Sequence, residues 1–176
     1  MSPGQAAFTI GHSTRSVHDF ISLLLSHHIE LVVDVRTVPR SRRNPQFNRE
    51  NLPQSLQEAE IDYEHIAALG GFRRPNPHSA NAGWRNASFR GYADYMQTAA
   101  FGAAIEILVE RAQRQRLAVM CAEAVPWRCH RSLIADALLA RGLEPREIVS
   151  EGATRLHKLT SWARVDNGRV TYPGVV

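Results

Sequence analysis

Apolar residues along the chain form short runs that alternate with longer stretches of helical spacing. The runs have the length of buried strands and lie at residues 7–10, 30–35 and 117–121, and further strands are expected at residues 61–66 and 146–150. The stretches between them repeat an apolar side chain every three to four residues, at residues 17–25, 51–59, 92–113 and 130–141. Strands separated by helices favour parallel pairing. The pattern predicts an α/β fold with an open, mainly parallel sheet flanked by helices.

Polar residues mark where the first two helices should begin. Ser16 is followed three residues later by Asp19, a spacing typical of a helix N-terminus. Asn51, with Gln54 three residues on, is expected to cap the short second helix in the same way. The stretch at 92–113 is expected to form two helices, with a break near Gly102 or just before it.

Two segments lack a clear period. Residues 69–90 contain two adjacent glycines, two prolines and four arginines, and are expected to form a long basic surface loop or to be disordered. Residues 151–176 contain an Asn167-Gly168 pair between short β-prone stretches, which predicts a small C-terminal hairpin or extension. A length of 176 residues fits a single domain over 1–176.

The composition is that of a soluble globular protein. Hydrophobic residues make up 44% and charged residues 22% of the chain. The apolar runs are far shorter than the ~20 residues that span a bilayer. The N-terminal residues lack the basic segment and apolar core of a signal peptide, so we expect a cytoplasmic protein with no membrane partner and with its two cysteines reduced.

The net charge of +4 comes from 21 basic and 17 acidic residues, and much of the excess lies in residues 36–49 and 73–90. Either stretch could bind a partner that carries phosphate. An excess of this size is also common on ordinary solvated surfaces. The charge therefore leaves both interpretations open.

Reactive side chains are concentrated where the strand at 117–121 leads into the helix at 130–141. Cys121, Glu123, Arg128, Cys129, His130 and Arg131 fall within eleven residues. If the strands are parallel, the residues after the strands at 7–10 and 30–35 reach the same edge of the sheet. Ligands of open α/β folds bind at that edge, and helix N-termini attract anions. One crevice is therefore predicted to hold all these groups.

The two cysteines allow several chemistries. Cys129, next to a helix N-terminus, His130 and Arg131, is a plausible nucleophile or redox thiol, or simply a small buried residue. Cys121 is more simply a core residue. A metal site is less consistent with the spacing of the two cysteines. A phosphatase-like loop fits poorly, because six residues rather than five separate Cys121 from Arg128 and none is glycine.

Charged residues at the strand ends complete the candidate site. Asp34 and Arg36 alternate on a strand and therefore point to the same side, either as an ion pair or as ligand contacts. Asp34 and Glu123 could act as a base–acid pair if the fold brings them together. His12 follows the first strand directly, so it is the most interesting histidine of the N-terminal half.

These motifs resemble the domain-of-unknown-function 488 family. The resemblance rests on Gly11-His12-Ser13, Asp34-Val35-Arg36 with Ser41, Leu69-Gly70-Gly71, Phe89-Arg90, Met120-Cys121-Ala122-Glu123, Cys129-His130-Arg131 and the tail His157 with Leu159-Thr160. It implies that the crevice is the family's site, and it names no reaction. Trp127 and Arg128 depart from the family pattern and could narrow the site or provide a stacking surface.

The candidate residues divide into two groups. The catalytic candidates are Cys129, Glu123, Asp34 and His12. The ligand-binding candidates are Ser13, Arg36, Ser41, Arg90, Cys121, His130, Arg131 and His157. No metal ligands are assigned, and the cofactor and the oligomeric state stay open.

Three functions are consistent with this set. The first is an enzyme that binds an anionic or nucleotide-like ligand, uses Cys129 or Glu123 for the chemistry, and covers the ligand with the loop at 70–90. The second is a nucleic-acid-binding or processing accessory protein that stacks bases on Trp84, Trp127 or Phe89. The third is a metal-dependent or metal-sensing protein that uses Cys121, Cys129 and a histidine.

Overall fold

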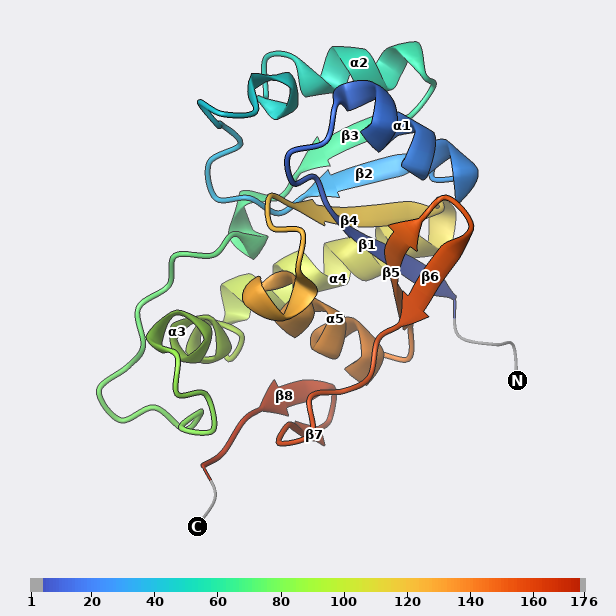
Figure 1. Ribbon diagram of the computed structural model, residues 1–176. Coiled ribbons are helices and arrows are strands. Elements are labelled where there is room, and N and C mark those ends of the chain that lie inside the picture. The colour runs from blue at the N-terminus through green and yellow to red at the C-terminus, as the bar shows by residue number, and fades with distance from the viewer. Residues whose placement is uncertain (1–4, 175–176) are drawn as a thin grey trace.

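A computed structural model describes residues 5–174 and shows the expected α/β fold (Figure 1). Its main sheet has six strands in the order β3-β2-β4-β1-β5-β6. Their bounds are β1 (Ala6–Gly11), β2 (Leu31–Asp34), β3 (Asp62–His65), β4 (Leu117–Cys121), β5 (Glu144–Ser150) and β6 (Ala153–Leu156). The first five strands pair in parallel. Residues 1–4 of the N-terminal stretch and 175–176 of the C-terminal extension lie outside the described part.

β6 was not anticipated from the sequence. It pairs antiparallel with β5 at the edge of the sheet. Its residues are largely exposed, so the strand has no apolar run by which a pattern would identify it.

Helices cover both faces of the sheet, which explains why its central strands are apolar on both sides. The elements on one face are α1 (Val17–Ser26) and α2 (Leu52–Glu58), and those on the other are α3 (Ala87–Tyr95), α4 (Ala99–Arg114) and α5 (Arg131–Ala140). Within residues 5–174 no helix is long and apolar enough to cross a membrane.

The two predicted caps had different outcomes. The Ser16 hydroxyl accepts a hydrogen bond from the Asp19 amide at 3.0 Å, as its spacing predicts. Asn51 precedes α2, but its side chain makes no capping hydrogen bond and instead donates to the carbonyl of Pro45. The capping prediction for Asn51 was therefore wrong, because its backbone is helical (φ −115°, ψ −45°) rather than extended as in a capping residue.

The long loop is ordered and shorter than expected. α3 begins at Ala87, with Asn86 as its cap, so the last residues of the predicted loop at 69–90 are helical. The break before α4 falls at residues 96–98. The carboxylate of Asp94 holds the loop by accepting hydrogen bonds from the amide of Asn76, the hydroxyl of Ser79 and the side chain of Asn81.

The C-terminal segment forms the predicted hairpin, β7 (Arg164–Asp166) and β8 (Arg169–Thr171). Asn167 and Gly168 both have positive φ at its turn, as a type I′ hairpin requires. The buried carboxylate of Asp136 on α5 fixes the segment by accepting from Tyr172 and Thr160. The hairpin is therefore joined to the same domain.

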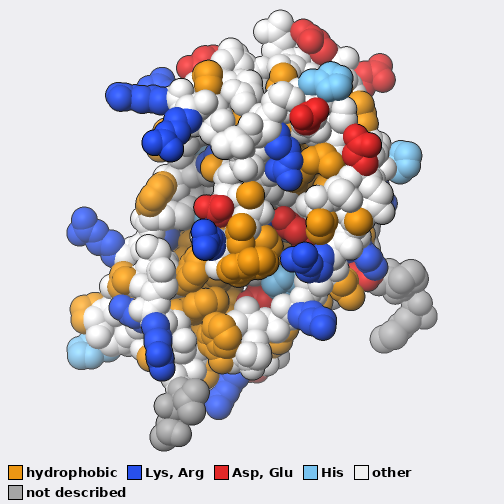
Figure 2. All heavy atoms as spheres, in the orientation of Figure 1, with side chains coloured by type: hydrophobic (Ala, Val, Ile, Leu, Met, Phe, Trp, Pro, Cys, Tyr) orange, Lys and Arg blue, Asp and Glu red, His pale blue; other side chains and the backbone are white. Residues whose placement is uncertain are grey.

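On the face shown in Figure 2, Lys and Arg side chains are spread over the surface with Asp and Glu among them, and hydrophobic side chains gather near the middle. The net positive charge thus does not form one continuous basic surface on this face.

Candidate functional site

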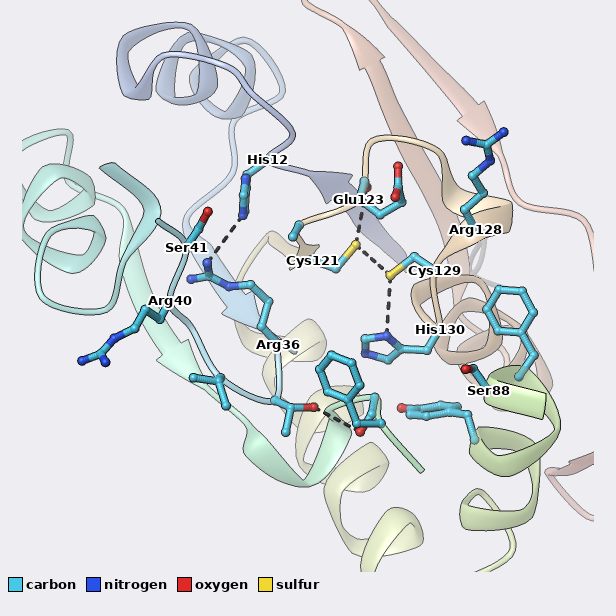
Figure 3. Close-up of a pocket in the computed structure, with 17 residues that line it drawn as sticks. His12, Arg36, Arg40, Ser41, Ser88, Cys121, Glu123, Arg128, Cys129 and His130 are labelled. Carbon is cyan, nitrogen blue, oxygen red and sulfur yellow. Dashed lines mark hydrogen bonds between the residues drawn. The ribbon is translucent and has the colours of Figure 1, made fainter. Parts of the chain in front are cut away.

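Three parallel strands end side by side at one edge of the sheet, and the residues there line a cavity of about 380 Å³. β1 leads into His12, β2 is followed by Arg36, and β4 ends with Cys121 (Figure 3). Cys129 and His130 reach the cavity from the start of α5. Of the sequence candidates, the cavity is lined by His12, Arg36, Ser41, Cys121, Glu123, Cys129 and His130.

The two thiols are in contact. The Sγ atoms of Cys121 and Cys129 lie 2.9 Å apart, although eight positions separate the residues in sequence. The turn formed by Pro126–Arg128 reverses the chain after β4 and returns Cys129 to the strand end. Both residues are buried, so the thiols form part of the cavity wall rather than its mouth.

A buried guanidinium lies behind the thiols. Arg131 donates from Nη1 to the Cys121 sulfur at 2.8 Å and to the Glu123 carbonyl at 2.7 Å. Its Nη2 forms a 2.7 Å ion pair with Glu147, whose other oxygen accepts from Thr9. Arg131 does not line the cavity; it is held in place by β5 and β1 and contributes its charge from behind.

This arrangement separates the pKa values of the two thiols. Burial opposes ionisation of Cys121, but the hydrogen bond from Cys129 and the charge of Arg131 outweigh burial and lower the pKa of Cys121. The pKa of Cys129 is raised, because its thiol donates to Cys121 and is itself buried. Within the pair, Cys121 is therefore the thiol that ionises more readily, and Cys129 is the one that keeps its proton.

His130 lies beside the pair as a neutral imidazole. Its Nε2 donates to the carbonyl of Val35 at 3.1 Å, which leaves Nδ1 as an acceptor 3.6 Å from the Cys129 sulfur. The ring also packs against Tyr92. Burial lowers the pKa of His130 to about 4.

His12 is held in the same neutral state on the other side of the cavity. Its Nδ1 donates to the carbonyl of Ser13 at 2.7 Å, and its ring stacks on Phe47. Its Nε2 faces the guanidinium of Arg36 at 3.5 Å. Burial lowers the pKa of His12 to about 4, so this imidazole is an acceptor at neutral pH.

Asp34 and Arg36 form the ion pair that their alternation on a strand allows. Arg36 donates from Nε at 2.9 Å and from Nη2 at 2.7 Å to the carboxylate of Asp34, which also accepts from the Tyr63 hydroxyl. Asp34 is fully buried and does not line the cavity. It positions Arg36, and it does not pair with Glu123 as a base–acid couple.

Glu123 contributes mainly through its backbone. Its carbonyl accepts from Arg131, while its side chain is exposed and accepts a long 3.4 Å hydrogen bond from the amide of Val125. This carboxylate therefore has freedom to move over the cavity.

The remaining candidates lie elsewhere. Ser13 has a positive φ of 52° and donates its amide to the Ala122 carbonyl, so it shapes the strand end. Arg90 donates to the carbonyls of Trp84 and Arg85 outside the cavity. His157 hydrogen-bonds to Asp136 at 2.7 Å and helps to anchor the C-terminal segment.

Sequence reasoning missed several cavity residues, among them Arg40, Phe72 and Tyr92, which line the cavity beside Arg128 and Phe89. Phe72 is 92% exposed and has a positive φ of 57°, which is uncommon for a bulky residue and often marks a functional position. No local residue pattern identifies the missed positions, since only the fold brings them next to the thiols.

Within residues 5–174 no three His, Cys, Asp or Glu side chains are grouped as possible metal ligands, so the hypothesis of a metal site has no cluster to support it. Cys121 and Cys129 face each other, and His130 directs only one ring nitrogen toward them.

Comparisons with known proteins give one match. A family model described as "Domain of unknown function DUF488" matches residues 16–138. The matched span includes the ends of β2 and β4, both cysteines and Arg131. No curated protein matches the chain, and no solved structure does.

Proposed function

The chain belongs to the DUF488 family, and because that description specifies no reaction, we propose from the geometry of the site that the protein is a thiol-dependent enzyme acting on an anionic small molecule. Cys121 is the nucleophile in this proposal. The reaction class is substitution at an electrophilic centre of a ligand bound in the cavity at the carboxyl edge of the sheet.

The observation that carries the proposal is the 2.8 Å contact between Nη1 of Arg131 and the Cys121 sulfur. A buried thiol ordinarily stays protonated, because the thiolate loses its hydration. Here a buried cation and the donating thiol of Cys129 replace that hydration. The sequence favoured Cys129 for the chemistry, and the contact transfers that role to Cys121.

Cys129 is placed to handle the proton. When the Cys121 sulfur bonds to the electrophile, the leaving group departs with its electron pair and takes the proton of the Cys129 thiol. In the second step water displaces the Cys121 thiolate from the electrophile, and the proton that water releases passes by way of Nδ1 of His130, 3.6 Å from the Cys129 sulfur, to Cys129 and restores its thiol. The two residues therefore serve as acid and relay behind the nucleophile.

The cavity wall specifies the ligand class. Arg40 and Arg128 provide cationic groups at the cavity, and Arg36 provides a buried one that is already paired with Asp34. Phe72, Phe89 and Tyr92 give an apolar surface opposite them. A small molecule with a carboxylate or phosphate and a flat apolar part matches both walls.

Alkylation of a matched pair of cysteine variants tests the proposal. The Cys129→Ser variant retains a hydroxyl donor and leaves Cys121 as its thiol, while Cys121→Ser leaves Cys129. We expect the rate for Cys121 to rise at a lower pH than that of an ordinary thiol, because its pKa is lowered, and Cys129 to react slowly. Rates are followed by intact mass spectrometry from pH 5 to 9.

The charge of the reagent tests the ligand class. For Cys121 we expect the ratio of the iodoacetate rate to the rate of neutral iodoacetamide to be larger than the same ratio for free cysteine. Arg128→Gln should lower that ratio to the value for free cysteine. Arg114→Gln changes an exposed arginine of α4 outside the cavity and serves as the control. A faster Cys129, or a Cys121 rate that rises only above pH 8, would overturn the proposal.

A further inference from the structure

All three tryptophans of the chain line a second cleft. Trp84 comes from the long loop, Trp127 from the turn after β4, and Trp162 from the C-terminal segment. The cleft has a volume of about 640 Å³. It is separated from the thiol cavity by the turn at Pro126–Arg128, which presents Trp127 to the cleft and Arg128 to the cavity.

The indoles offer open aromatic surface. Trp127 is 64% exposed and Trp162 is 42% exposed. Trp84 packs edge-on against Trp162 with ring centroids 5.0 Å apart, which fixes the floor of the cleft. Its Nε1 is buried and has no hydrogen-bond partner among the described residues, whereas a buried indole N–H usually has one. The cleft thus has exposed stacking faces.

The charge around the cleft is positive. Arg155 on β6 and Lys158 just after it are exposed and line the cleft. Among the described lining residues the carboxylate is that of Glu147, and it is neutralised by its ion pair with Arg131. An apolar peptide would leave those cations unused.

We propose that this cleft binds a nucleobase together with its phosphate. The exposed faces of Trp127 and Trp162 stack on the base, and Arg155 and Lys158 hold the phosphate. A free nucleotide and a segment of single-stranded nucleic acid share this chemistry. The inference goes beyond the thiol chemistry, since none of the groups that contact the ligand belongs to the cysteine pair.

Intrinsic tryptophan fluorescence reports on the cleft directly, because all three tryptophans of the chain line it. The probes are adenosine monophosphate, adenosine, and a mixed-sequence DNA strand of twelve nucleotides. We expect the monophosphate to quench the emission saturably, and adenosine to bind more weakly. A strand that binds more tightly than the monophosphate identifies nucleic acid as the ligand, and equal binding identifies the free nucleotide.

Two variants separate stacking from charge. Trp127→Ala should weaken binding at least about fivefold, which corresponds to the lower end of ~1–3 kcal/mol for a base stacked on an aromatic side chain. Lys158→Glu should weaken binding and reduce its dependence on salt. Arg42→Glu makes the same charge change at an exposed position outside the cleft and should leave binding unchanged.

Two results would overturn the inference. One is the absence of saturable quenching by either nucleotide or strand at millimolar concentration. The other is an equal loss of binding in Arg42→Glu and Lys158→Glu, which would indicate attraction to net charge rather than a site. Cys121→Ser should bind normally, so failure of the thiol proposal does not affect this test.

Discussion

Gly11 lies directly against the backbone of Glu123. A Cβ on Gly11 would be 1.8 Å from the carbonyl oxygen of Glu123 and 2.7 Å from Nη1 of Arg131. Because Gly11 has no side chain, the end of β1 can pack directly against the backbone of the segment between Cys121 and Cys129. The same carbonyl accepts from Arg131, so this contact also sets the position of the guanidinium behind Cys121.

Replacing Gly11 with alanine should destabilise the protein and disturb the thiol site. The backbone on both sides is held by the sheet, so relief of the clash requires the loop to shift, at a cost of about 1–3 kcal/mol. Urea unfolding and the alkylation rate of Cys121 measure the two effects. Gly102→Ala is the control: nothing lies within 4 Å of its Cβ on helix α4, and it should stabilise by up to ~1 kcal/mol. A Gly11→Ala protein as stable as wild type would contradict the packing argument.

Stability should fall as the pH is lowered from 7 to 5. His12 and His130 have folded pKa values of about 4, both lowered mainly by burial, against 6.5 for an ordinary histidine side chain. The unfolded chain therefore binds more protons in this range, and stability rises with pH until about 6.5. Each imidazole should account for roughly 2 kcal/mol between pH 7 and 5.

Denaturant unfolding at several pH values measures this slope. The His130→Gln variant should lose about half of it, because one of the two buried imidazoles is gone. His18→Gln, at a fully solvated position on α1, should keep the wild-type slope. A slope unchanged by His130→Gln would show that other groups control the acid sensitivity.

The attachment of the C-terminal segment to α5 should depend on the carboxylate of Asp136. Asp136 accepts from His157 and Tyr172 at 2.7 Å each, and from both the amide and the hydroxyl of Thr160. Asp136→Ala leaves these donors without an acceptor and should cost roughly 3 kcal/mol. Limited proteolysis should then cut between α5 and the hairpin.

Asp166→Ala provides the comparison, since this carboxylate is exposed in the hairpin and its removal should change stability by less than ~0.5 kcal/mol. Equal proteolysis of the two variants would mean that the segment is held mainly by apolar contacts.

Much of the fold could be predicted from local pattern. The apolar runs identified the central strands β1, β2 and β4, because burial on both faces of a parallel sheet imposes continuous apolar runs, and the helical spacing identified the helices between the strands. Ser16 and the Asn167-Gly168 pair were identified because their chemistry acts within a few residues. β6 was missed because an exposed edge strand is defined only by its partner.

The candidate site could be predicted only in part from the local sequence pattern. Parallel topology alone placed the ends of β1, β2 and β4 at one edge, and the residues there do line the cavity. The roles of Cys121 and Cys129 could not be assigned, since both are cysteines near one loop. Arg131 contacts the sulfur of Cys121, and its orientation depends on Glu147, a residue of β5 with no local relation to the thiols.

The sequence by itself determined the sheet, its helices and the neighbourhood in which reactive groups gather, because those depend on periodicity and on the direction of neighbouring strands. Only the tertiary structure decided that the two thiols touch, that Arg131 contacts the sulfur of Cys121, and that three distant tryptophans share a cleft. The physical reason is that ionisation and recognition depend on charges and aromatic faces within a few ångströms, whatever their separation along the chain.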